Sequence, residues 1–174
     1  MKKFMILFLV AKDRPGIVDD FSTFLFKRHA NIEDSRMADL GGRFSVMTLF
    51  SCAPEHLETI RKDLDKLRKR GFEVSLHEAD DPSAVSKRPE VPLKLEVVAM
   101  DHPGIVQKVV HILNSHGINI YALNTQVLRS PLSGAPLFDL SLEAGVPPGV
   151  AIARVKEELN RLAAAENLDL NFLR

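Results

Sequence analysis

The chain has 174 residues, of which 45% are hydrophobic, and its 23 lysines and arginines balance its 23 aspartates and glutamates. A neutral protein has no bulk charge with which to hold a polyanion, so direct binding of nucleic acid is not expected. No apolar run approaches the roughly 20 residues that span a bilayer. The single cysteine, Cys52, cannot form an internal disulfide. Together these features indicate a cytoplasmic protein without a membrane partner.

The first segment, MKKFMILFLVA, combines two lysines with an apolar run, as a secretory signal does. Residues 91–100, VPLKLEVVAM, occupy the same place before the second copy of the motif described next. A segment that is needed twice as a strand is not expected to be cleaved once, so both segments are predicted to be β-strands. Because both faces of the first strand are apolar, a second sheet or another chain is expected to cover the face away from the helices.

A six-residue motif occurs twice, as DRPGIV at residues 13–18 and as DHPGIV at residues 101–106, 88 residues later. The apolar residues after each copy follow the i, i+4, i+7, i+8 spacing of one helix stripe. Pro15 and Pro103 suit the first turn of these helices, where a proline loses no helical hydrogen bond. The motif therefore predicts a strand, a tight turn and a helix in each half of the chain.

Each motif is followed by two β-rich runs, a second amphipathic stretch and a short alternating segment. In the first half these elements are expected at residues 31–40, 42–52, 54–71 and 72–76. In the second half they are expected at residues 119–129, 135–144, 149–167 and 168–172. Gly41 and Gly42 form a good hairpin turn. Each half thus reads βαββαβ, which predicts an α+β fold of two ferredoxin-like units.

The segment between the halves, ADDPSAVSKRPE, is polar, contains proline and lacks periodicity. Such a composition is typical of a linker. We therefore predict a first domain at residues 1–79, a linker at residues 80–90 and a second domain at residues 91–174.

Two βαββαβ units, each with D-x-P-G-I-V at the first turn and N-I at the start of the second strand, resemble tandem ACT domains. These are small-molecule-sensing modules of amino-acid metabolism, and the resemblance covers nearly the whole chain without leaving a catalytic domain. Within the family the chain is similar to the glycine cleavage system transcriptional repressor group. The resemblance implies an amino-acid effector such as glycine, no other cofactor, a homodimer, and a DNA-binding transcription factor or a metabolic enzyme as partner.

The repeated motif also has a physical use. A glycine at the turn lets a ligand approach the backbone, and unpaired N–H groups at a helix start attract a carboxylate. An asparagine offers both a donor and an acceptor, and an aspartate could face an ammonium group. By resemblance, the ligand lies at an interface between two ACT units, with the turn from one and polar side chains from the other. The candidate ligand-binding residues are Asp13, Arg14, Gly16, Ile17, Asn31, Ile32, Asp101, His102, Gly104, Ile105, Asn119 and Ile120.

Other readings of the same residues remain open. Prolines and glycines at such turns are often purely structural, many ACT domains bind nothing, and Arg14 differs from His102, so the two sites need not share a specificity. The six histidines lack metal-ligand spacing, and no catalytic set stands out. Acylphosphatase and RNA-binding modules share the topology, but the glycine-rich loop of the first and the paired aromatics of the second are missing. We therefore predict an amino-acid-sensing regulatory protein that is not an enzyme; the alternative is a ligand-free ACT module that dimerises or scaffolds a metabolic protein.

Overall fold

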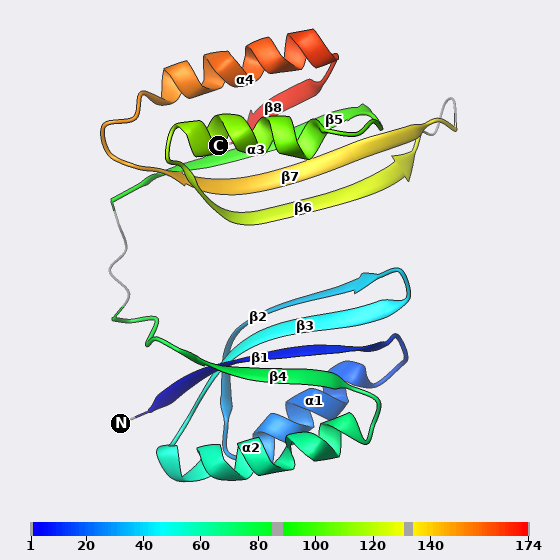
Figure 1. Ribbon diagram of the computed structural model, residues 1–174, viewed down its shortest axis with the longest axis vertical. Helices are drawn as coiled ribbons and strands as arrows, with labels where there is room; N and C mark the ends of the chain where they lie inside the picture. The colour runs from blue at the N-terminus through cyan, green and yellow to red at the C-terminus, as the bar shows by residue number, and fades with distance from the viewer. Residues whose placement is uncertain (1, 85–88, 131–133, 174) are drawn as a thin grey trace. The chain divides into compact units, whose positions relative to one another are not determined.

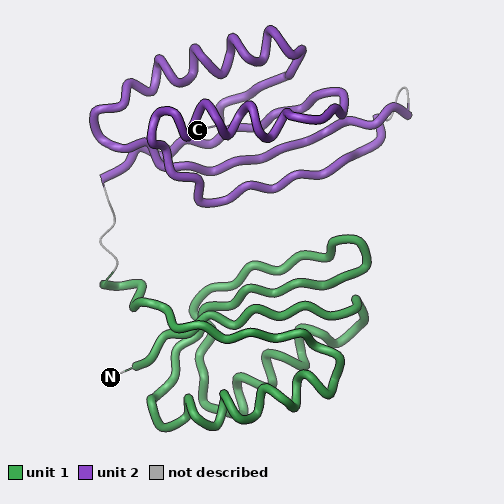
Figure 2. The backbone as a smooth tube through the Cα atoms, viewed as in Figure 1, with its two compact units in different colours: residues 1–86 green, residues 87–174 purple. Residues whose placement is uncertain are grey.

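The computed structural model describes residues 2–84, 89–130 and 134–173. The chain divides into two compact units, Met1–Ser86 and Lys87–Arg174 (Figure 2). The predicted linker, residues 80–90, spans this division, and residues 85–88 lie outside the described part of the chain. The predicted domain bounds therefore stay a prediction, and each unit is described by itself.

Unit 1 forms one four-stranded antiparallel sheet with the order β2-β3-β1-β4. Both of its helices lie against the same face of this sheet (Figure 1). The elements of unit 1 are β1 (Lys3–Lys12), α1 (Ile17–Phe26), β2 (Asn31–Leu40), β3 (Arg43–Cys52), α2 (Pro54–Arg68) and β4 (Glu73–Ala79).

Unit 2 repeats this arrangement with the strand order β6-β7-β5-β8. Its elements are β5 (Val91–Met100), α3 (Ile105–Ser115), β6 (Asn119–Arg129), β7 (Pro136–Val146), α4 (Ile152–Glu166) and β8 (Asp169–Leu173). Again the two helices cover one face of the sheet (Figure 1). The prediction of an α+β fold with two ferredoxin-like units is confirmed.

Each unit has its own hydrophobic core between the sheet and the helices. In unit 1, alternate residues of β1 such as Met5 and Leu7 are buried, and they meet the apolar stripe of α1, which includes Phe21. The intervening residues of β1 lie on the opposite face, where no helix of unit 1 covers them, and Phe8 is 40% exposed. What covers that face stays a prediction.

Glycines with positive φ shape the turns of unit 1. Gly41 (φ 60°) and Gly42 (φ 75°) connect β2 and β3, as a two-residue hairpin turn requires. The prediction that Pro15 lies in the first turn of α1 is wrong, as is the same prediction for Pro103 in α3. Gly16 (φ 87°) interrupts the helical conformation after the proline, so α1 begins only at Ile17.

Thr48 is the one polar side chain with an unpaired atom in the core of the described residues. Its side chain is fully buried, and its Oγ1 has no hydrogen-bond partner there. Thr48 faces Leu7 across the sheet; in unit 2 the corresponding partner of Leu95 is Leu142, an apolar residue.

We expect Thr48→Val to raise the free energy of unfolding by about 1–2 kcal/mol, because it removes a buried hydroxyl without a partner and preserves the shape. Urea unfolding followed by circular dichroism measures the change. Thr125→Val, at an exposed position of β6, is the matched control and should shift the free energy by less than about 0.5 kcal/mol. A less stable Thr48→Val variant would contradict this account of the core.

Candidate functional site

The turn between β1 and α1 presents the start of a helix without a cap. Gly16 is the residue before the helix, and the first helical hydrogen bond runs from the Asp20 N–H to the Gly16 carbonyl (2.9 Å). No side chain among the described residues caps this start. The Asp13 N–H donates to the Gly42 carbonyl (3.0 Å), which ties the turn to the β2–β3 hairpin. The N–H groups of α1 that come before the Asp20 N–H have no acceptor within the helix and are therefore suited to bind a carboxylate.

Unit 2 has the same geometry. Gly104 has φ 101°, the Lys108 N–H donates to its carbonyl (3.0 Å), and no side chain in the described part of the unit caps α3. The Asp101 N–H donates to the Pro136 carbonyl (3.3 Å), so this turn also contacts the neighbouring hairpin. The repeated motif thus builds two equivalent helix starts, as its sequence predicts.

The asparagines lie at the other end of each sheet. Lys12, next to the turn of unit 1, pairs with Arg43, whereas Asn31 pairs with Ser51 beside the start of β1. Ten strand residues at about 3.3 Å each put roughly 30 Å between the two ends. In unit 2, Asn119 likewise pairs with Gly145 of β7, at the end of the sheet away from the turn.

The predicted residues of each unit therefore form two groups instead of one. The turn groups contain Asp13, Arg14, Gly16 and Ile17 in unit 1 and Asp101, His102, Gly104 and Ile105 in unit 2. The strand groups contain Asn31 and Ile32 in unit 1 and Asn119 and Ile120 in unit 2. No single unit can offer both groups to one small ligand.

The isoleucines of the turns differ from those of the strands. Ile17 and Ile105 are each 2% exposed and belong to the two cores. Only their backbone N–H groups could therefore meet a ligand. Ile32 is 37% exposed, while Ile120 packs partly against the core of unit 2.

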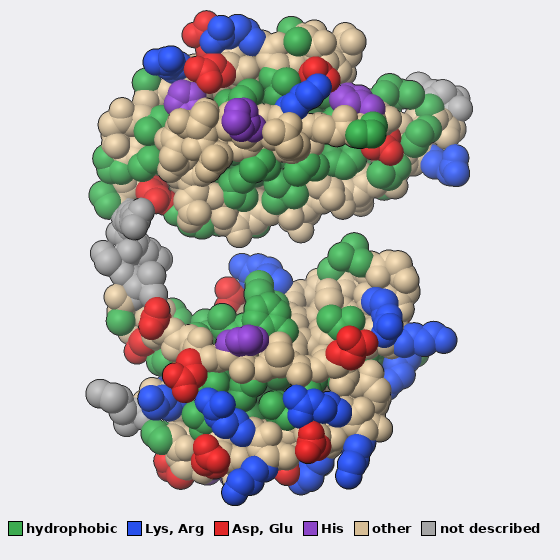
Figure 3. Space-filling view, in the orientation of Figure 1, with side chains coloured by type: hydrophobic (Ala, Val, Ile, Leu, Met, Phe, Trp, Pro, Cys, Tyr) green, Lys and Arg blue, Asp and Glu red, His purple; other side chains and the backbone are tan. Residues whose placement is uncertain are grey.

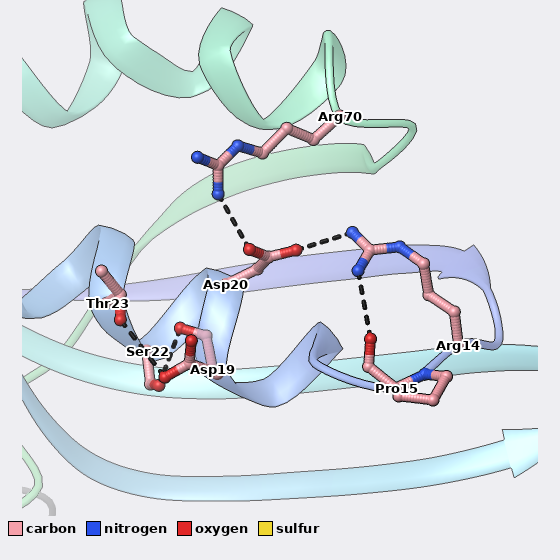
Figure 4. A network of polar contacts seen from close by, with 7 residues as sticks. All are labelled: Arg14, Pro15, Asp19, Asp20, Ser22, Thr23 and Arg70. Carbon is pink, nitrogen blue, oxygen red and sulfur yellow. Dashed lines mark hydrogen bonds and ion pairs between the residues drawn. The ribbon is translucent and has the colours of Figure 1, made fainter.

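Arg14 is held by contacts with the turn and with the helix that follows it. Its Nη2 lies 2.6 Å from Asp20 Oδ2, and its Nη1 donates to the Pro15 carbonyl (3.3 Å). Arg70 approaches the other oxygen of Asp20 at 2.9 Å, so the two guanidinium groups lie on either side of one carboxylate (Figure 4). The hydrogen bond from Arg14 lowers the pKa of Asp20, although partial burial of the carboxylate opposes it.

His102 takes the place of Arg14 in unit 2. Its Nδ1 lies 3.2 Å from the Pro103 carbonyl oxygen. One turn therefore carries a permanent cation that is paired to its helix, and the other carries an imidazole. This difference supports two turns with different ligand preferences.

Glu33 is a candidate site residue that the sequence pattern does not reveal. A β-bulge between Ile32 and Asp34 leaves Glu33 outside the regular strand pairing. Asn31 Nδ2 donates to Glu33 Oε1 (3.0 Å), and Ser51 Oγ donates to the same oxygen (2.6 Å). The hydrogen bond from Ser51 is the main cause that lowers the pKa of Glu33. Asn31 thus presents an ionised carboxylate beside its amide.

The corresponding end of unit 2 has another chemistry. The bulge there falls at Tyr121, and Asn119 pairs with Gly145. A Cβ atom on Gly145 would lie 2.0 Å from Glu90 Oε2 and 2.5 Å from the Tyr121 hydroxyl oxygen. With glycine at position 145, these two side chains lie close to the backbone beside Asn119. Unit 1 thus has the Glu33 carboxylate beside its asparagine, whereas unit 2 has both the Glu90 carboxylate and the Tyr121 phenol there.

A protein-family model described as the ACT domain matches residues 3–77, which is nearly all of unit 1, and unit 2 repeats its topology and its turn motif. The chain contains an ACT domain. It is 24% identical over 166 residues to the glycine cleavage system transcriptional repressor of Escherichia coli (strain K12), across 94% of this chain and 86% of that one.

Two solved structures extend the comparison. A crystal structure of an unknown protein from Galdieria sulphuraria superposes with a TM-score of 0.83 at 31% identity, over 99% of this ACT protein and 98% of that chain. A crystal structure assigned to the glycine cleavage system transcriptional repressor superposes with a TM-score of 0.71 at 21% identity, over 100% and 99% of the two chains. At this identity the second likeness shows the shared fold.

Two further observations concern the described residues of the ACT protein. None of their helices is long and apolar enough to cross a bilayer. They contain no group of three or more histidine, cysteine, aspartate or glutamate side chains placed to hold a metal ion. The relative from Escherichia coli is named a repressor, and the absence of catalytic activity in this chain stays a prediction.

Proposed function

We propose that this tandem ACT protein senses a small amino acid, such as glycine, and regulates a protein partner in response. The effector lies where two ACT units meet, either within one chain or between two copies. Binding there favours one packing of the units over another and so changes the surface offered to the partner. The observation that carries the proposal is the pair of uncapped helix starts behind Gly16 and Gly104.

An amino acid matches the two groups of residues. Its carboxylate suits the unpaired N–H groups of α1 or α3, each at a helix start with partial positive charge. Its ammonium group suits the Glu33 carboxylate and the Asn31 amide oxygen, which lie together at the start of β2. A short ligand touches both only if the helix start comes from one ACT unit and the asparagine from another.

The kind of partner is inferred from the similarity to a named relative and not from a binding site on this chain. The relative from Escherichia coli is named a transcriptional repressor of the glycine cleavage system. With no net charge, this chain is poorly suited to hold DNA by itself. We therefore place its regulatory effect, in the cytoplasm, on a DNA-binding transcription factor or an enzyme of amino-acid metabolism.

A thermal-shift screen against the common amino acids, each at about 10 mM, tests the proposal. A ligand at 100 times its dissociation constant adds about 2.7 kcal/mol to stability, which corresponds to several degrees for a chain of this size. We expect glycine or a similarly small amino acid to raise the melting temperature, and isothermal titration calorimetry then gives the affinity.

Variants at the asparagines identify which site responds. Asn31→Ala should weaken binding at least tenfold if the strand group of unit 1 contacts the effector, and Asn119→Ala tests unit 2 in the same way. Asn124→Ala, at an exposed position of β6, is the matched control and should bind like the wild type. Equal binding by all three variants would overturn the assignment of the strand groups.

The alternative is a ligand-free module that dimerises, and one observation favours it. The face of the unit 1 sheet away from the helices carries exposed apolar side chains, including Phe8 (40%) and Met47 (44%) (Figure 3). On the corresponding face of unit 2, Lys94 pairs with Glu143 (2.7 Å) and Gln126 donates to Asp139 (2.7 Å). No response to any amino acid, together with a dimer that Met47→Lys dissociates in sedimentation experiments, would favour this alternative.

A further inference from the structure

A small groove lies between α1 and α2 on the helical side of unit 1. Its volume is about 200 Å³. At about 30 Å³ per water molecule, this is room for roughly seven waters or one small organic molecule. Phe24 and Leu67, which are 6% and 1% exposed, form an apolar floor. Lys27, Arg28, Lys66 and Arg70 surround it.

The groove gathers more positive charge than its carboxylates balance. Asp20 is the one acidic side chain that lines it, and Asp63 lies behind it, 2.5 Å from Arg28 and 2.7 Å from Lys66. Four cations line the groove, and Asp20 and Asp63 balance two of them, which leaves two positive charges in excess. The four are Lys27, Arg28, Lys66 and Arg70. In a chain with no net charge, this is a local concentration of positive charge.

Two guanidinium groups are held in fixed positions at the groove. Arg28 lies 3.8 Å from the centre of the Phe24 ring and also donates to the Phe24 carbonyl (2.7 Å). Arg70 is held by Asp20, which Arg14 contacts from the other side (Figure 4). Fixed guanidinium groups lose little conformational freedom when they bind phosphate or carboxylate oxygens. The groove is therefore organised before any ligand arrives.

The carboxylates of the groove are ionised at neutral pH. Hydrogen bonds from Lys66 and then from Arg28 lower the pKa of Asp63, as Arg14 does for Asp20. Their negative charges are thus already counted in the balance, and the excess of positive charge persists at neutral pH.

Unit 2 does not repeat this cluster of cations. By the spacing of the repeat, Lys27 corresponds to Ser115, Arg28 to His116 and Arg70 to Ala165. Arg161 takes the place of Lys66, and Lys108 takes that of Asp20. The Arg28–Asp63 pair becomes a pair between His116 and Glu158 (3.0 Å), and α3 and α4 approach each other more closely than α1 and α2 do. Since unit 2 builds a corresponding helix pair without cations at the positions of Lys27, Arg28 and Arg70, the fold alone does not require these three.

We infer that the α1–α2 groove of unit 1 binds a small dianion, either a phosphate monoester or a short dicarboxylate, with Lys27 and Arg70 as its main contacts. The charge excess selects for two negative charges, the volume limits the ligand to a few carbon atoms, and the apolar floor accommodates them. This site goes beyond the proposed amino-acid site, because that site uses the helix starts and the strand groups.

Calorimetric titration of the full chain with phenyl phosphate, succinate and inorganic phosphate tests the inference, with sodium chloride at matched ionic strength as the baseline. We expect saturable binding of at least one organic dianion, and the comparison of phenyl phosphate with succinate distinguishes the two ligand sources. Lys27→Gln/Arg70→Gln should weaken that binding at least tenfold. Lys62→Gln, an exposed cation of α2 that does not line the groove, should bind like the wild type.

Three outcomes would overturn the inference. The dianions could give no more heat than the salt baseline, or Lys62→Gln could weaken binding as much as the double variant does. A hexaglutamate peptide could bind while the small dianions do not, which would assign the groove to an acidic protein segment. The response to amino acids should be unchanged in the double variant, so failure here and failure of the proposed sensing function are separate results.

Discussion

Replacing Phe21 with alanine is expected to destabilise unit 1 by about 3–5 kcal/mol, because a fully buried aromatic ring is lost and a cavity remains. Phe21 is 0% exposed and joins α1 to the sheet. Urea unfolding followed by far-UV circular dichroism measures the loss. The chain has no tryptophan and only one tyrosine, Tyr121 in unit 2, so tyrosine fluorescence reports separately on unit 2.

Phe26 provides the matched control for this experiment. It is the last residue of the same helix and is 79% exposed. Phe26→Ala should change the free energy of unfolding by less than about 0.5 kcal/mol, as exposed substitutions usually do. If both alanine variants cost the same, the core of unit 1 is not arranged around α1 as described.

Replacing Gly16 with valine is expected to cost about 1–3 kcal/mol through backbone strain alone. Gly16 has φ 87°, a conformation that a β-branched L-residue adopts only with strain. The space around an added Cβ is open, since its nearest atom would be Arg14 Nη1 at 3.9 Å. Urea unfolding followed by far-UV circular dichroism again gives the change.

The Gly16→Asn variant distinguishes backbone strain from side-chain size as the cause of the lost stability. Asparagine is similar in size to valine but tolerates the left-handed region, so this variant should lose clearly less stability than Gly16→Val. An equal loss in both variants would show that the turn rejects side chains by contact and not by conformation.

Local features of the fold are readable from the sequence because they depend on neighbours along the chain. The spacing of apolar residues after each motif predicts α1 and α3, and the Gly41–Gly42 pair predicts the first hairpin. The 88-residue repeat predicts two equivalent units, and the topology confirms them. The start of α1 is an error of two residues, since the pattern does not show that Gly16 has positive φ.

The candidate sites depend on contacts between distant residues, and these are harder to predict. The motif predicts the helix starts at Gly16 and Gly104. It does not predict that the turns and the asparagines lie at opposite ends of each sheet. That separation follows from the direction of the chain: each helix returns along the sheet before the next strand begins. The role of Glu33 could not be predicted, because the alternation of apolar and polar residues along a strand does not reveal a β-bulge.

The sequence by itself determines the repeated βαββαβ order, the turns and the buried faces of this protein, because short-range sterics and periodic burial set them. Only the tertiary structure brings Arg28 to Asp63 and Arg70 to Asp20, pairs that are 35 and 50 residues apart. It also places the Tyr121 phenol next to Glu90 in unit 2, where unit 1 has Glu33 without a phenol. Such pairings depend on how helices cross a sheet in three dimensions, and a linear pattern does not contain that information.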